Sequence, residues 1–98
     1  MFALLPEIVK KLQQMASTNA SVPQLLREAI KLLPSDQRGS LYLIIYFREA
    51  FHLSLKSASP IGGWSESGNG EISDERIEEF LRPEMLQTRQ LWTDSELS

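Results

Sequence analysis

Apolar residues recur at helical spacing along the first third of the chain. A helix predicted over residues 6–15 places its apolar positions on one face, namely Ile8, Val9, Leu12 and Met15. A second helix is predicted to follow Ser21, because Ser21 and Gln24 have the spacing of a capping box. Pro34 ends that helix, since proline cannot continue the hydrogen-bond pattern.

The central segment, residues 41–47, is apolar on every side. It is rich in β-branched and aromatic residues, so a buried strand is one alternative. The apolar spacing of three to four residues continues through Phe51 to Leu55, which favours a helix. We therefore predict a central helix over about residues 36–52, capped by Ser35 or Asp36 and surrounded by the other helices.

A tight corner is predicted after the central helix, where Ser54 can cap a short helix that runs to about Ala58. Arg48-Glu49, followed by His52-Leu53-Ser54-Leu55-Lys56, resembles the helical corner in the C-terminal domain of bacterial ribosomal L7/L12 proteins. That family has Arg-Glu and then Gly-Leu-Gly-Leu-Lys-Glu-Ala. His52 stands where the family has its first glycine. The resemblance covers a small part of the chain and implies the corner geometry, with no ribosomal function.

The second half begins with a turn over residues 60–64 and a polar loop over residues 65–70. A further helix is predicted after Ser73, because Ile72 and Ile77 have the spacing of a hydrophobic staple around this cap. Pro83 is expected to end or kink the helix, which leaves residues 83–92 for a sixth helical piece. Residues 93–98 are expected to be a frayed tail.

These elements predict an all-α protein, a small bundle of five or six short helices around the central apolar helix. Residues 1–92 are expected to form a single domain. The predicted core consists of Leu25, Leu26, Ile30, Leu33, Leu41, Ile44, Ile45, Phe47, Phe51, Leu55, Ile77, Phe80 and Leu81.

Charge is unevenly distributed along the chain, whose formal net charge is −3. Residues 1–64 carry seven basic and four acidic residues, a balance of +3, whereas residues 65–98 carry three basic and nine acidic residues, a balance of −6. An acidic segment repels nucleic acids and attracts basic protein surfaces. The same asymmetry is also expected if the acidic segment packs on the basic half of its own chain.

The acidic segment supplies the candidate binding residues. Glu75, Glu78 and Glu79 have the i, i+3, i+4 spacing of one helical surface. Trp64 precedes this helix and is interpreted either as a core residue or as an apolar binding anchor. The predicted partner-binding set is Trp64, Glu71, Asp74, Glu75, Glu78 and Glu79.

Several classes of chemistry lack a sequence signal. The chain has no cysteine, which excludes disulfides, thiol catalysis and cysteine-based metal sites. His52 is the single histidine, and no second group is identified that could orient it for catalysis. We predict no cofactor and no catalytic site. The composition and the shortness of the longest apolar run predict a cytoplasmic protein without a membrane segment.

The function predicted from these features is that of a non-enzymatic protein–protein interaction module. In this hypothesis a small regulator, adaptor or immunity-type inhibitor presents an acidic helical surface to a basic protein partner. One alternative is a nucleic-acid-associated helical regulator that uses the basic residues of the first half, Lys10, Lys11, Arg27, Lys31 and Arg38. Another alternative is a small enzyme that uses His52. Self-association through residues 41–47 is left open.

Overall fold

The computed structural model describes residues 4–37, 39–67 and 69–92. Across these ranges the chain is helical, and its β-structure is limited to an isolated bridge between Trp64 and Ile72. The elements are α1 (Pro6–Ser17), α2 (Val22–Leu32), η1 (Ser35–Gln37), α3 (Ser40–Phe51), α4 (Leu55–Ala58), η2 (Ser59–Gly63), α5 (Asp74–Gln87) and α6 (Arg89–Trp92). The all-α helical bundle predicted from the sequence is confirmed.

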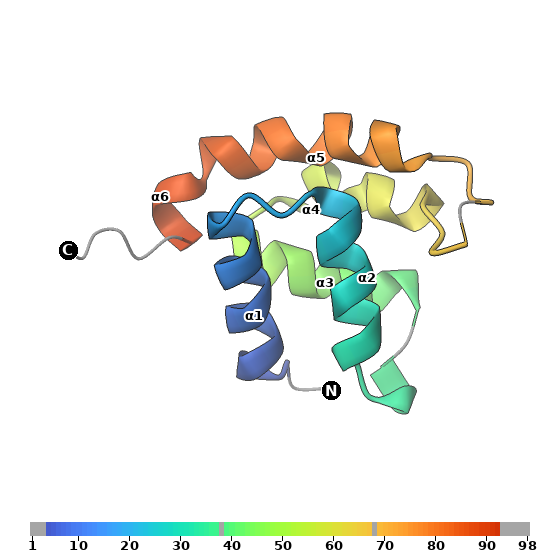
Figure 1. Cartoon of the computed structure of the whole chain (residues 1–98), viewed down its shortest axis with the longest axis horizontal. Coiled ribbons are helices and arrows are strands. Elements are labelled where there is room, and N and C mark those ends of the chain that lie inside the picture. The colour runs from blue at the N-terminus through green and yellow to red at the C-terminus, as the bar shows by residue number, and fades with distance from the viewer. Residues whose placement is uncertain (1–3, 38, 68, 93–98) are drawn as a thin grey trace.

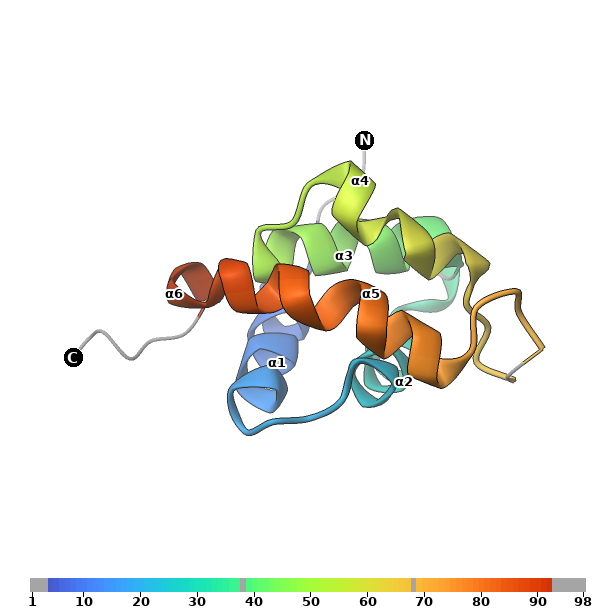
Figure 2. The same cartoon turned by 90° about the horizontal axis from the view of Figure 1, so that it is seen from above.

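Helix α5 crosses the top of the molecule, and α1 and α2 lie below it as neighbours (Figure 1). Seen from above, α5 runs between the pair α1 and α2 on one side and the pair α3 and α4 on the other (Figure 2). Helix α3 contacts α1, α2, α4, η2 and α6, as a central helix should.

The first two helices begin where the sequence indicates. Pro6 occupies the first position of α1, where its missing N–H has no partner to lose. Ser21 caps α2 through a complete capping box: its hydroxyl accepts from the Gln24 N–H at 3.2 Å, and the Gln24 side chain accepts from the Ser21 N–H at 2.8 Å. The starts of both helices are thus fixed by local sequence.

The central segment forms a helix, so the strand alternative is wrong, but its start and its burial differ from the prediction. Residues Ser35–Gln37 form a separate 3-10 turn, and α3 is capped by Gly39 rather than by Ser35 or Asp36. Gly39 has φ 123°, which a side chain would oppose. Helix α3 buries one face only, and Leu41 remains 63% exposed.

The tight corner predicted after α3 is present, and Ser54 caps the short helix α4 as expected. His52 ends the helix in the left-handed conformation, with φ 55°, at the position where the resembled family has glycine. The Leu53 N–H donates to the Arg48 carbonyl at 3.3 Å, and Ser54 caps α4 by accepting from the Ser57 N–H at 3.0 Å. The chain therefore reverses within three residues.

Helix α5 passes through Pro83 and continues to Gln87, so the alternative in which Pro83 ends the helix is wrong. Pro83 is exposed, and the helix is instead held along its length by buried Ile77, Leu81 and Met85. Packing of this stripe offsets the loss of one backbone hydrogen bond. The sixth helix is shorter than predicted, spanning Arg89–Trp92.

A single cluster of buried apolar residues extends from α1 to α6. Of the predicted core, Leu25, Leu26, Leu33, Phe47, Phe51, Ile77 and Leu81 are buried, Ile30, Ile44 and Ile45 are half-buried, and Leu41, Leu55 and Phe80 are exposed. Leu41, Leu55 and Phe80 lie on the solvent-facing sides of α3, α4 and α5. The prediction omitted large core residues that the structure buries: Ile8, Leu12, Tyr46, Trp64, Met85 and Trp92.

Among the helices described here, none is both long and apolar enough to cross a bilayer.

Candidate functional site

The predicted acidic residues gather at the beginning of α5. Ser73 caps the helix by accepting from the Arg76 N–H at 3.2 Å, which places Asp74 and Glu75 in the first turn. Carboxylates at this end are stabilised by the unpaired backbone N–H groups. The acidic cluster is therefore built into the start of the helix, and its members differ in what they contact.

Asp74 is committed to an internal network. Its Oδ1 accepts from the Trp64 Nε1–H at 2.8 Å, and its Oδ2 accepts from Arg27 Nη1 at 3.0 Å. The hydrogen bond from Trp64, followed by that from Arg27, holds the pKa of Asp74 below its ordinary value of 3.8. Arg27 also lies 5.2 Å from the centroid of the Trp64 ring. The network joins α2, the loop before α5 and α5 itself.

Glu78 is also used by the fold. Its Oε1 accepts from the Val22 N–H at 2.6 Å, and its Oε2 accepts from Arg82 Nε at 2.7 Å. Arg82 in turn donates to the Ala20 carbonyl at 2.7 Å. Glu78 and Arg82 thereby hold α5 against the turn that begins α2.

Glu71, Glu75 and Glu79 are exposed, and they are the members of the cluster left facing solvent. Glu79 approaches Arg76 at 3.8 Å, and both side chains are well exposed, so that pair contributes little. The structure thus divides the predicted set into two carboxylates that hold the fold and three that are available at the surface.

Trp64 was expected to supply an apolar contact to a partner, but the structure buries its side chain in the core. Trp64 is 6% exposed and belongs to the core, which was the alternative interpretation of this residue. Its indole N–H finds a partner in Asp74, so burial leaves no polar atom unsatisfied. Trp64 therefore presents only a small part of its surface, in a hollow that it lines with Ile30 and Leu43.

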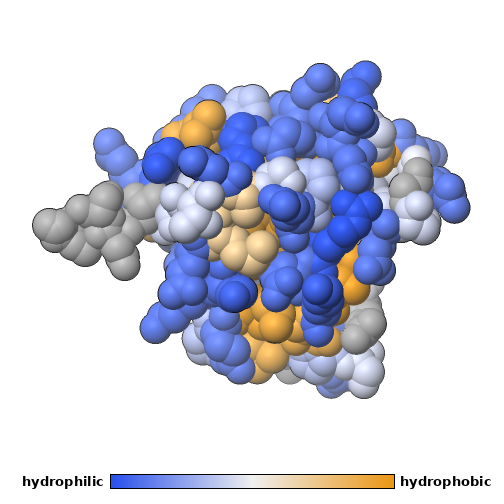
Figure 3. All heavy atoms as spheres, viewed as in Figure 1, coloured by the Kyte–Doolittle hydropathy of each residue, from blue (hydrophilic) through white to orange (hydrophobic). Residues whose placement is uncertain are grey.

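Leu86 is an exposed apolar residue that the sequence interpretation missed. It is 50% exposed and shares the outer side of α5 with Glu75 and Glu79, at the spacing i, i+4 and i+11. Because Pro83 was expected to end or kink the helix, the sequence did not indicate that Leu86 lies on the same side of α5 as Glu75 and Glu79. Figure 3 shows the top of the molecule as hydrophilic over the start of α5, with an apolar area over its C-terminal part. We call Glu71, Glu75, Glu79 and Leu86 the acidic surface.

An open groove of about 540 Å³ adjoins the acidic surface between α2 and α5. It is lined by Ser21, Pro23, Gln24, Arg27, Asp74, Glu75 and Glu78. Three carboxylates line this groove against one arginine, and that arginine is already bonded to Asp74. The groove therefore extends the acidic character of the surface toward α2.

The residues named in the alternative hypotheses lie on three helices: Lys10 and Lys11 are exposed on α1, Arg27 and Lys31 lie on α2, and His52 is at the end of α3. His52 is exposed at the end of α3, where its backbone N–H donates to the Arg48 carbonyl and its side chain makes no hydrogen bond or ion pair with any described residue. Of the basic residues, Arg27 is bonded to Asp74, Lys31 lies 4.0 Å from Glu28, and Arg38 is outside the described residues. Within residues 4–37, 39–67 and 69–92, no cluster of side chains has the makeup of a metal site.

Comparisons of this chain with known protein families, with curated proteins and with solved structures find no match.

Proposed function

We propose that this protein is a non-enzymatic interaction module, a small regulator, adaptor or inhibitor, that binds a basic segment of a partner protein on its acidic surface. The observation that carries the proposal is the division among the carboxylates of α5. Asp74 and Glu78 are held by Arg27, Trp64, Val22 and Arg82, whereas Glu71, Glu75 and Glu79 face solvent. These three exposed carboxylates make no contact that holds α5 against α2, and Glu79 alone among them has a basic neighbour in the described residues, the exposed Arg76 at 3.8 Å.

The chemistry of the surface defines the partner. Glu75 and Glu79 are one helical turn apart, which suits basic side chains at similar spacing. Leu86, two turns beyond Glu79, supplies an apolar contact that Trp64 does not. An amphipathic segment that carries Lys or Arg at one end and an apolar side chain at the other complements the acidic surface. A cytoplasmic location for the complex remains a prediction from the sequence.

The test isolates the partner and then changes the surface. Affinity capture from host lysate at low and at high salt, with mass-spectrometric identification, supplies a candidate partner, and calorimetry with the purified partner supplies its affinity. The triple variant Glu71→Gln, Glu75→Gln, Glu79→Gln is expected to bind at least about tenfold more weakly than wild type. Glu78 is left intact, because its loss would disturb the contact with α2.

A matched control separates a local effect from a change in net charge. The variant Glu7→Gln, Glu28→Gln, Asp36→Asn removes the same charge from α1, α2 and η1, and it is expected to bind as wild type does. Equal weakening in both triple variants would show that net charge alone attracts the partner. Unchanged affinity in the α5 variant would overturn the proposed surface.

A further inference from the structure

Helix α3 carries an apolar ridge that the described residues leave partly exposed. Leu41, Ile45 and Arg48 follow one another at i, i+4 and i+7, so they lie along one side of the helix. Leu41 is 63% exposed and Ile45 is half-buried, whereas the opposite side is packed in the core through Leu43, Phe47 and Ala50. The ridge lies on a different helix from the acidic surface, and α3 lies below α5 in the view of Figure 1.

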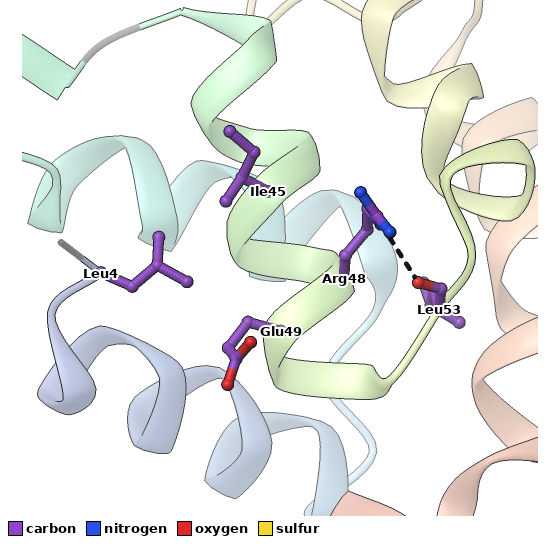
Figure 4. Close-up of a pocket in the computed structure, with 5 residues that line it drawn as sticks. All are labelled: Leu4, Ile45, Arg48, Glu49 and Leu53. Atoms are coloured by element: carbon purple, nitrogen blue, oxygen red, sulfur yellow. Dashed lines mark hydrogen bonds between the residues drawn. The ribbon is translucent and has the colours of Figure 1, made fainter. Parts of the chain in front are cut away.

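A hollow of about 270 Å³ opens one turn further along the same ridge. It is lined by Leu4, Ile45, Arg48, Glu49 and Leu53 (Figure 4). The Leu4 and Ile45 side chains extend toward one another, and Arg48 is turned toward the Leu53 carbonyl, with Nε 3.4 Å from that oxygen. The volume is several times the roughly 30 Å³ share of a water molecule in the liquid, which leaves room for a leucine side chain.

The projecting leucine and the hollow have reciprocal positions on α3. In an antiparallel pair of α3 helices related by a two-fold axis at Ile45, residue 41 of one copy lies opposite residue 49 of the other. Leu41 of each copy is then directed at the hollow beside Glu49 of its partner. One two-fold operation thus fills both hollows and covers both leucines, as an isologous interface requires.

The charges on this ridge also suit a second copy of the chain. Arg48 and Glu49 are adjacent and of opposite sign, so the patch is close to neutral and does not repel itself. The exposed Glu49 side chain makes no hydrogen bond or ion pair with any described residue, so Leu41 of the second copy breaks no such bond when it packs beside it. The acidic surface on α5, in contrast, would repel its own copy. We propose that the protein forms a two-fold symmetric homodimer in which the α3 ridges pack antiparallel around Ile45.

Sedimentation equilibrium of the full chain tests the association. One helix and its flanks make a small interface, so we expect dissociation constants of roughly 10–500 µM and a mass that rises from 11.2 kDa toward twice that value with concentration. Leu41→Asp is expected to weaken association at least about tenfold, since it removes the apolar side chain that packs against Ile45 and places a carboxylate beside Glu49 of the other copy. Leu91→Asp is the matched control, because Leu91 is 62% exposed but lies on α6.

Disulfide trapping tests the register, since the chain contains no cysteine of its own. In Ile45→Cys the two new thiols face each other across the axis, and mild oxidation is expected to produce covalent dimer about tenfold faster than in Leu91→Cys. A chain that stays monomeric at the highest concentration would overturn the dimer. Association with equal trapping at both positions would overturn the α3 interface. Neither result bears on the acidic surface, whose variants leave the α3 ridge intact.

Discussion

Asp74 and Glu75 are consecutive carboxylates in the first turn of α5, and their surroundings give them different roles. Asp74 accepts hydrogen bonds from Trp64 and Arg27, whereas Glu75 is exposed and makes no hydrogen bond or ion pair with a described residue. Both share the favourable end of the same helix. A comparison of the two therefore isolates the network around Trp64 from the general effect of a negative charge.

Replacing Asp74 by Asn is expected to destabilise the protein by about 1 kcal/mol at neutral pH, since Arg27 and Asp74 are both partly exposed and the pair is screened by solvent. The folded-state pKa of Asp74 is lowered, so its contribution is fully present above the ordinary value of 3.8 and is lost as the pH falls through the folded-state value. The stability difference between wild type and Asp74→Asn should thus be largest above pH 3.8 and shrink as the pH falls below it through the lowered folded-state pKa. Urea unfolding at a series of pH values measures it.

Glu75→Gln is the control for this pH dependence, because it removes a charge from the same turn without breaking a hydrogen bond seen in the structure. It is expected to change the free energy of unfolding by less than about 0.5 kcal/mol at neutral pH. If Asp74→Asn were no more destabilising than Glu75→Gln, the hydrogen bonds of Asp74 with Trp64 and Arg27 would contribute nothing measurable to the free energy of unfolding.

At the scale of the element, the corner between α3 and α4 depends on one residue in a conformation that is uncommon for it. His52 has φ 55°, a region where a Cβ atom meets the following carbonyl group. The corner forms nonetheless, since Leu53 bonds back to Arg48 and is buried, and Ser54 caps the next helix. Tertiary packing and two caps therefore hold His52 where glycine would fit without strain.

His52→Gly is expected to stabilise the protein by about 0.5–1 kcal/mol, because glycine adopts this conformation freely. Asn19→Gly is the matched comparison. Asn19 has φ 71° after α1, but asparagine tolerates this region better, so its gain should be smaller. Chemical unfolding of both variants measures the difference. A loss of stability in His52→Gly would mean that the imidazole contributes contacts that outweigh the backbone strain.

Local signals predicted where most helices begin, and they failed where packing decides. The capping box at Ser21 and the caps at Ser54 and Ser73 were predicted from short patterns, and the structure has all three. The start of α3 could not be found in this way, since Gly39 caps it without a side-chain bond. Helix α5 continues through Pro83 because it buries a stripe of apolar residues that reaches Met85. The burial of that stripe can be seen only in the packed structure.

The candidate site was predictable as a region and not as a set of contacts. The acidic spacing in α5 is visible in the sequence, and Glu71, Glu75 and Glu79 are exposed as a surface site needs. The partners of Asp74 and Glu78 come from α2 and its turn, about fifty residues earlier, so no local sequence pattern could predict them. For the same reason the burial of Trp64 against α5 could not be distinguished beforehand from an exposed anchor.

The whole molecule is held by one core that includes residues from both chain ends. Ile8 in α1 and Trp92 in α6 belong to the same buried cluster. Trp92 packs edge-to-face on Phe51 with centroids 5.1 Å apart and donates its indole N–H to the Met85 carbonyl at 3.0 Å. Trp64 is buried in the same cluster, beside the loop that precedes α5. A single core predicts that both regions unfold together.

The two tryptophans allow this cooperativity to be measured. Trp64→Phe leaves Trp92 as the sole tryptophan reporter, and Trp92→Phe leaves Trp64. Each variant is expected to lose roughly 1–3 kcal/mol, through a smaller buried ring and a missing hydrogen bond. Within each variant, however, tryptophan fluorescence and far-UV circular dichroism should report the same midpoint in urea. In Trp92→Phe, a fluorescence transition at lower urea than the loss of helix would instead show that the loop and the start of α5 unfold on their own. The acidic surface would then be only partly populated at that urea concentration.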